Sequence, residues 1–205
     1  MRSGRVEAFS DGVIAILITI MVLELHVPHG TDLHALRPLL PVWLTYVLSF
    51  TYLGIYWNNH HHMLQLTDRV DGRVLWANLH LLFWLSLVPF ATGWMGENGF
   101  ATLPTAAYGI VLLLAAIAYY ILQAQIVAAQ GPASRLRAAL GRDWKGKVSP
   151  CIYVVAILVA FGNRWVALGL YVVVALIWLV PDRRLERAVQ ARPLDDPGRG
   201  PGPLA

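Results

Sequence analysis

The chain has 205 residues, of which 57% are hydrophobic and 14% charged, with a mean hydropathy of +0.55 and a formal net charge of +4 at pH 7. This composition is too apolar for an ordinary soluble domain of the same length, and so excludes that class. A sequence pI near 9.5 would suit a nucleic-acid-binding protein, but the placement of the basic residues, described below, argues against one.

The apolar residues come in blocks long enough to cross a bilayer, whose hydrocarbon core of about 30 Å needs about 20 residues of helix. Six membrane-spanning helices are predicted, at residues 6–26, 36–62, 72–95, 101–130, 148–162 and 164–181. The fifth would rise only about 22 Å, so it must stand upright, thin the bilayer or extend into its flanks. The sequence therefore predicts an all-α polytopic membrane domain at 1–181. A basic, Pro- and Gly-rich tail follows at 182–205, which we expect to be disordered.

The first predicted helix carries an apolar stripe. At about 100° per residue, Ile16, Ile20 and Leu23 lie on one side of the helix, and Thr19 lies beside them. In a helix this apolar, three aliphatic side chains at helical spacing are also typical of lipid contact or helix packing. The stripe alone therefore does not identify a function.

Polar residues occupy the other side of the same helix. Glu7, Ser10 and Asp11 point largely away from the stripe. A carboxylate within the bilayer is costly unless it is paired, so we expect Asp11 to have a partner. Arg5, Asn78 or a histidine of a neighbouring helix would serve.

The second predicted helix ends in its most polar run, Tyr-Trp-Asn-Asn-His-His-His at 56–62. Three consecutive histidines point about 100° apart and cannot all bind one ion, and the single cysteine, Cys151, provides no multi-cysteine site. We therefore expect no fixed transition-metal site and no cofactor. Trp57 is expected to lie at headgroup depth, with the histidines bonded to water or to other helices, where Asn78 and His80 are available.

The basic residues are concentrated in alternate loops. Of the 16 Lys and Arg residues, only Arg37 and Arg164 fall on the second side of a six-helix arrangement. The positive-inside rule then predicts that both termini are cytoplasmic. The membrane topology alone accounts for basic residues concentrated on one side, so we expect no nucleic-acid partner.

The segment from Arg5 to Gly12, Arg-Val-Glu-Ala-Phe-Ser-Asp-Gly, opens the first helix. It resembles the arginine-x-x-x-Phe-Ser-Asp signature of the transmembrane protein 175 family, specifically its prokaryotic single-repeat members. The likeness continues through Trp57 and His60, Asn78, and the run Pro-Phe-Ala-Thr at 89–92. It covers about the first half of the chain by motif and the whole chain by topology.

The resemblance implies a potassium channel without a Thr-Val-Gly-Tyr-Gly filter, and this sequence contains no such loop. It further implies a homotetramer of six-helix subunits in the cell membrane, with the first helices around the pore. Ile16, Ile20 and Leu23 would form the constriction, and Thr19 would tune selectivity. The family's signature and polar network correspond to Arg5, Phe9, Ser10, Asp11, Trp57, His60 and Asn78.

The function expected on this basis is a weakly potassium-selective cation channel, with potassium and other monovalent cations as permeant species. Removing an ion's water without replacement ligands would cost tens of kcal/mol, so its hydration must largely survive passage through an aliphatic ring. The ring is therefore expected to act as a hydrophobic gate.

Two other functions remain open from the residues. A proton-coupled secondary transporter, or a proton leak, would use the intramembrane Asp and His residues, although the internal repeats and broken helices of transporters are not evident. A membrane enzyme is disfavoured because neither a Gly-x-Ser-x-Gly nor a His-Glu-x-x-His motif occurs.

Overall fold

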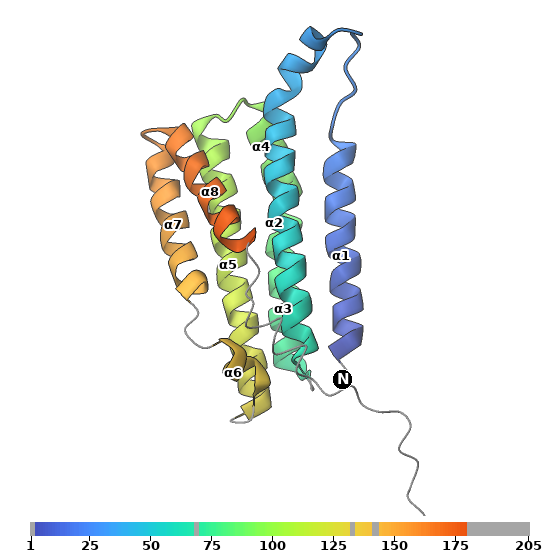
Figure 1. Ribbon diagram of the computed structural model, residues 1–205, viewed down its shortest axis with the longest axis vertical. Coiled ribbons are helices and arrows are strands. Elements are labelled where there is room, and N and C mark those ends of the chain that lie inside the picture. The colour runs from blue at the N-terminus through green and yellow to red at the C-terminus, as the bar shows by residue number, and fades with distance from the viewer. Residues whose placement is uncertain (1–2, 68–69, 132–133, 141–143, 180–205) are drawn as a thin grey trace, which may run out of the picture.

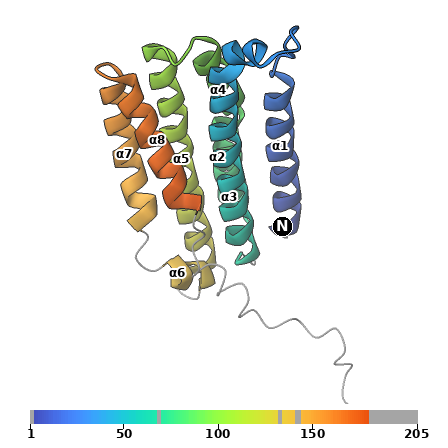
Figure 2. The same ribbon diagram turned by 45° about the horizontal axis from the view of Figure 1, so that its top comes forward.

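The computed structural model describes residues 3–67, 70–131, 134–140 and 144–179. The helices run side by side in a bundle, with α1 at one edge and α7 and α8 at the other (Figures 1 and 2). Their bounds are α1 Ser3–Leu23, η1 Leu33–Leu39 (a 3₁₀ helix), α2 Leu40–Gln65, α3 Gly72–Ser86, α4 Val88–Glu97, α5 Thr102–Gln130, α6 Arg135–Leu140, α7 Trp144–Ala160 and α8 Arg164–Leu179.

Four helical stretches are long and apolar enough to cross a membrane: Ser3–Leu23, Leu33–Gln65, Gly72–Glu97 and Thr102–Gln130. The all-α prediction is confirmed, and these four correspond to the first four predicted spans. Helices α7 and α8 have 17 and 16 residues and lie where the fifth and sixth spans were predicted, although α7 begins at Trp144 rather than Val148. The count of six spans stays a prediction, and the tail at 182–205 lies outside the described residues.

The third predicted span is broken into two helices, α3 and α4, at Leu87. Pro89 occupies the first turn of α4 and has no N–H to donate to the carbonyl of Leu85, so the α-helical ladder cannot continue unbroken. The N–H of Leu87 instead bonds back to Trp84 O at 3.2 Å, in a tighter turn. The sequence predicted a span over 72–95, and Gly72–Glu97 is long and apolar enough to be one, but the break within it was not predicted.

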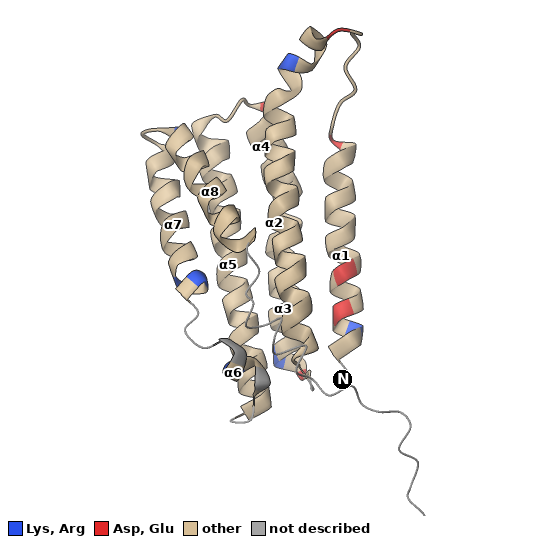
Figure 3. Ribbon diagram, viewed as in Figure 1, with Lys and Arg blue, Asp and Glu red and all other residues tan. Residues whose placement is uncertain are grey.

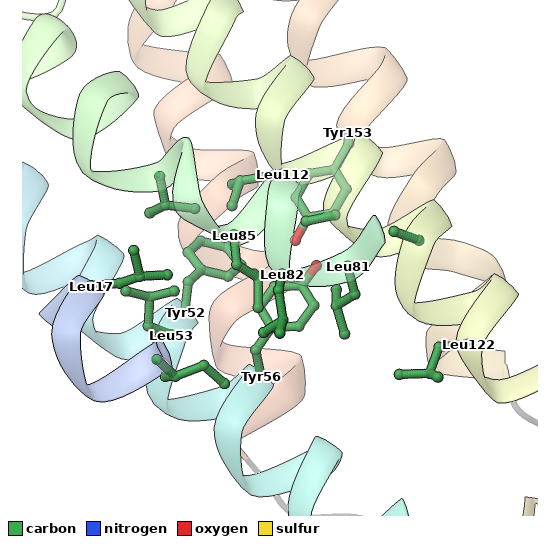
Figure 4. Packing of buried hydrophobic residues seen from close by; sticks show 14 of the residues in the cluster. Leu17, Tyr52, Leu53, Tyr56, Leu81, Leu82, Leu85, Leu112, Leu122 and Tyr153 are labelled. Atoms are coloured by element: carbon green, nitrogen blue, oxygen red, sulfur yellow. The ribbon is translucent and has the colours of Figure 1, made fainter. Parts of the chain in front are cut away.

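Large apolar side chains fill the centre of the bundle. Figure 4 shows Leu53 of α2 beside Leu17 of α1, and Tyr52 of α2 and Leu85 of α3 near Leu112 of α5. All five side chains are nearly or fully buried. Helix α5 packs against α3 on one side and α7 on the other, so this core joins the middle of the bundle to its far edge.

Buried hydroxyl groups add hydrogen bonds between helices. The Tyr52 hydroxyl donates to the carbonyl of Tyr171 at 2.6 Å and so joins α2 to α8. Ser49 lies 2.6 Å from the Thr92 hydroxyl and 3.0 Å from that of Tyr108, which joins α2 to α4 and α5. Within a membrane such bonds contribute about 0.6 kcal/mol each on average.

The charged residues mark the two ends of the bundle (Figure 3). Basic positions lie at the end where α1, α3 and α7 begin, and η1 and the start of α8 carry one each, Arg37 and Arg164, at the opposite end. The acidic residues of α1 lie in its first half, between the basic end and the middle of the bundle. This separation agrees with the loop pattern of the sequence.

Candidate functional site

Helix α1 attaches to the subunit along one narrow strip. The strip packs against α2, α3 and α4. Its buried residues recur at helical spacing and are Val6, Ser10, Ile14, Leu17 and Met21. The remaining circumference of α1 is therefore available to lipid, to a pore or to another subunit.

The predicted aliphatic stripe lies on this open side. Ile16 is 57% exposed, Ile20 41% and Leu23 81%. Thr19 is also exposed, and its hydroxyl lies within hydrogen-bond distance of the carbonyls of Ile16, at 2.8 Å, and Ala15, at 3.1 Å. The hydroxyl proton is thus satisfied within the helix, and the oxygen's lone pairs stay free to accept a hydrogen bond.

A buried polar chain ties the attached strip of α1 to two other helices. The Nδ2 group of Asn78 on α3 donates to Ser10 Oγ at 3.0 Å, and Asn78 Oδ1 lies 2.7 Å from His60 Nε2 on α2. Ser10 Oγ also donates to the carbonyl of Val6 at 2.8 Å. Ser10, His60 and Asn78 are each at most 2% exposed. The structure therefore brings together three of the predicted network residues.

A second contact between α1 and α2 lies beside this chain. Glu7 Oε1 is 2.6 Å from His61 Nδ1, as an ion pair if His61 is protonated. The contact is one of proximity rather than a directed hydrogen bond, because Nδ1 has no partner by hydrogen-bond geometry. Trp57 stacks on the His61 ring with centroids 6.0 Å apart, and Gln65 Nε2 lies 2.8 Å from His61 Nε2. The sequence predicted that the histidines would bond to other helices or to water, but it did not predict that His61 meets Glu7.

Other residues of the signature form no hydrogen bond with the described side chains of Ser10, Asn78 and His60. Phe9 is 56% exposed and Trp57 is 45% exposed. Arg5 is exposed and makes no hydrogen bond or ion pair with the described residues. Asp11 is half-buried, and its Oδ1 is enclosed by the subunit without a hydrogen-bond partner. The direct partner expected for Asp11 is therefore absent from the described part of this subunit, and the roles of these residues stay predictions.

The arrangement is suited to holding a helix rather than to catalysis or metal binding. Over the parts of the chain that the structure describes, no group of three or more His, Cys, Asp or Glu side chains converges as metal ligands would. The chain Ser10–Asn78–His60 is enclosed in the subunit, while the aliphatic stripe faces outward. Helix α1 thus presents an attached side, which Ser10 joins to the buried polar chain, and a free side that carries the aliphatic stripe.

Comparison with known proteins gives consistent matches. The family model described as endosomal/lysosomal potassium channel TMEM175 matches residues 5–89. The chain is 53% identical to a potassium channel of Chryseobacterium sp. (strain P1-3) over 190 residues, covering 93% of this chain and 99% of the relative. It is 35% identical to a potassium channel of Streptomyces collinus over 159 residues, covering 68% of this chain and 77% of that one.

A solved structure matches the fold. The crystal structure of a lysosomal potassium-selective channel TMEM175 homolog from Chamaesiphon minutus aligns with a TM-score of 0.76 and 29% sequence identity. The alignment covers 88% of this chain and 97% of that one.

Proposed function

We propose, since this chain belongs to the TMEM175 channel family, that α1 of each subunit lines a pore through which potassium ions cross the membrane. The family makes the chain a potassium channel and a multi-pass membrane protein rather than an enzyme. We propose that it needs no cofactor, with potassium as the permeant species.

The observation that carries this proposal is the exposed stripe of Ile16, Ile20 and Leu23 on the side of α1 away from its polar anchor. Helix α1 forms the edge of the subunit, so several copies can place their stripes around one axis (Figure 1). A ring of branched aliphatic side chains offers an ion no replacement ligands. It therefore acts as a hydrophobic constriction that conducts when wetted and closes when it dewets.

Selectivity in such a constriction is weak. The hydrated ion must lose part of its shell at the narrowest point, and potassium releases water more easily than sodium. Thr19 is exposed beside the stripe, and the lone pairs of its hydroxyl oxygen can accept from water in the shell of a passing ion. The channel is proposed to favour potassium over sodium modestly and to admit other monovalent cations.

We further propose a homotetramer in the cell membrane with both termini in the cytoplasm. Four copies give a closed ring in which every α1 has the same surroundings. The orientation is supported by the basic residues at the end where α1, α3 and α7 begin (Figure 3), since basic residues favour the cytoplasmic side. Native mass spectrometry of the purified protein would test the subunit number.

The constriction is tested by planar-bilayer recording in potassium/sodium bi-ionic solutions. Ile16→Asn places a polar side chain in the ring, which should raise single-channel conductance and shift the reversal potential toward zero. Leu23→Ala should widen the ring, and it should likewise raise the conductance and shift the reversal potential toward zero. Matched controls are Ile110→Asn on α5 and Leu158→Ala on α7, both of which change exposed residues far from α1 in sequence.

Unchanged conductance and ion preference in both Ile16→Asn and Leu23→Ala would overturn the constriction. The same recordings separate the other functions. A channel passes current down a potassium gradient without any added substrate, whereas a coupled transporter does not. A reversal potential that follows an imposed pH gradient and ignores potassium would instead favour a proton pathway.

A further inference from the structure

An open groove lies between α3 and α5, with a volume of about 510 Å³. It is lined by Arg73, Trp76, Ala77 and His80 of α3 and by Ile121 and Gln125 of α5. Neither the Ser10–Asn78–His60 chain nor the aliphatic stripe contributes a residue to it. The groove is therefore a separate surface feature of the subunit.

The spacing of the α3 residues places a cation and an indole on one helix face. Arg73, Trp76 and His80 stand at i, i+3 and i+7, and all three are exposed. Trp76 is 75% exposed, which is unusually open for the largest apolar side chain. Arg73 lies in the first turn of α3, because Asp71 caps the helix by accepting from the N–H of Val74 at 2.9 Å.

The polar groups of the groove are unpaired donors. Arg73 and Gln125 make no hydrogen bond or ion pair with the residues that the structure describes. His80 Nε2 accepts from Trp84 Nε1 at 2.9 Å, so in the neutral ring the proton lies on Nδ1 and can be donated elsewhere. None of the six lining residues is acidic. The groove thus offers several donors, one of them a full positive charge, and is complementary to an oxyanion.

The position along the bundle identifies the source of that anion. Arg73 lies in the first turn of α3, at the basic end of the bundle (Figure 3). Further along α3 the exposed face becomes apolar at Leu79 and Phe83. An exposed indole at the end of a membrane span is typical of headgroup depth. Basic grooves between membrane helices on the cytoplasmic side are suited to anionic lipid headgroups.

We propose that this groove binds the headgroup of an anionic phospholipid from the cytoplasmic leaflet. The Arg73 guanidinium pairs with the phosphate, and His80 Nδ1 and the Gln125 amide donate to the remaining headgroup oxygens. Ala77 and Ile121 form the apolar floor against which the glycerol region lies. The proposal rests on the orientation given under the proposed function.

Native mass spectrometry of the full-length protein in detergent tests it, with titrations of 1-palmitoyl-2-oleoyl phosphatidylglycerol and of the phosphatidylcholine with the same acyl chains. We expect the wild type to bind phosphatidylglycerol more tightly than phosphatidylcholine. Arg73→Gln should weaken phosphatidylglycerol binding about fivefold, from about 1 kcal/mol per basic residue, and leave phosphatidylcholine binding unchanged. Arg73→Lys should retain most of the preference. The matched control is Arg37→Gln, an exposed arginine in η1 at the opposite end, which should leave both affinities unchanged.

Equal binding of the two lipids by the wild type, or an unchanged affinity in Arg73→Gln, would overturn the proposal. So would displacement of phosphatidylglycerol by millimolar inorganic phosphate, because the site would then take free phosphate rather than lipid. Potassium currents recorded in bilayers of phosphatidylcholine alone keep the two proposals distinct. If these currents persist while lipid preference is absent, the lipid site fails and the channel function stands.

Discussion

Replacing Asn78 by leucine removes the side chain that joins α1 to α2 and α3. Asn78 Oδ1 lies 2.7 Å from His60 Nε2, and its Nδ2 donates to Ser10 at 3.0 Å. Leucine has a similar volume but offers neither group. A lost interhelical hydrogen bond in a membrane costs about 0.6 kcal/mol and up to about 1.7, and a buried ring nitrogen left unpaired adds about 1–3 kcal/mol. We therefore expect Asn78→Leu to lower the free energy of unfolding by about 2–3 kcal/mol.

Thermal melting of the purified protein in detergent measures this loss. For a chain of this length, about 2–4 °C per kcal/mol gives a fall of about 4–12 °C. Ser86→Ala is the matched control, because Ser86 lies on the same helix but is exposed, and its hydroxyl donates to the carbonyl of Phe83 in its own helix. It should melt within about 1 °C of the wild type.

A double-mutant cycle assigns the effect to the contact itself. Because Ser10 and Asn78 are hydrogen-bonded, Ser10→Ala and Asn78→Leu should not add, and a coupling of about 0.5–1.7 kcal/mol is expected. Additive effects would refute the view that the hydrogen bonds among Ser10, Asn78 and His60 anchor α1. An Asn78→Leu protein with the melting temperature of the wild type would refute it too.

Two further substitutions test the contacts that hold α8. The Tyr171 hydroxyl occupies the space that a Cβ at Gly109 would need, so Gly109→Ala should cost about 1–3 kcal/mol by melting. Gly169→Ala, with nothing within 4 Å, should be neutral or slightly stabilising, and an equal loss in both would show that crowding is not the cause. Tyr52→Phe removes the 2.6 Å bond to the Tyr171 carbonyl and should cost about 0.6–1.7 kcal/mol, while Tyr120→Phe at an exposed site should not change the melting temperature. A Tyr52→Phe protein as stable as Tyr120→Phe would contradict the role given to that bond.

Hydropathy was sufficient to locate the first four spans, because a helix in lipid must be both long and apolar. It failed where local backbone chemistry decides the outcome. The break at Leu87 follows from the missing N–H of Pro89, which an average over the window does not register. The earlier start of α7 at Trp144 adds Lys145 and Lys147 to the helix, and hydropathy places such residues in a loop.

The sequence was sufficient to predict which side of α1 is attached, but not which polar side chains form hydrogen bonds with one another. Helical periodicity placed Ser10 on the side opposite Ile16, and the structure buries the first and exposes the second. Periodicity carries no information about which polar side chains meet across a helix interface. Asn78 therefore pairs with Ser10 rather than with Asp11, and His80 bonds Trp84 of its own helix.

The two sides of α1 should separate stability from conduction. Ile16 is exposed on the surface of the single subunit. Ile16→Asn should therefore alter conductance, while the melting temperature of a dissociated subunit stays close to that of the wild type. Asn78 is enclosed, so Asn78→Leu should lower that melting temperature first, and any change in current should follow from a displaced α1. If Ile16→Asn destabilised the dissociated subunit as strongly as Asn78→Leu, the stripe would be part of the subunit core. Its assignment to the pore would then fail on stability alone, before any current was measured.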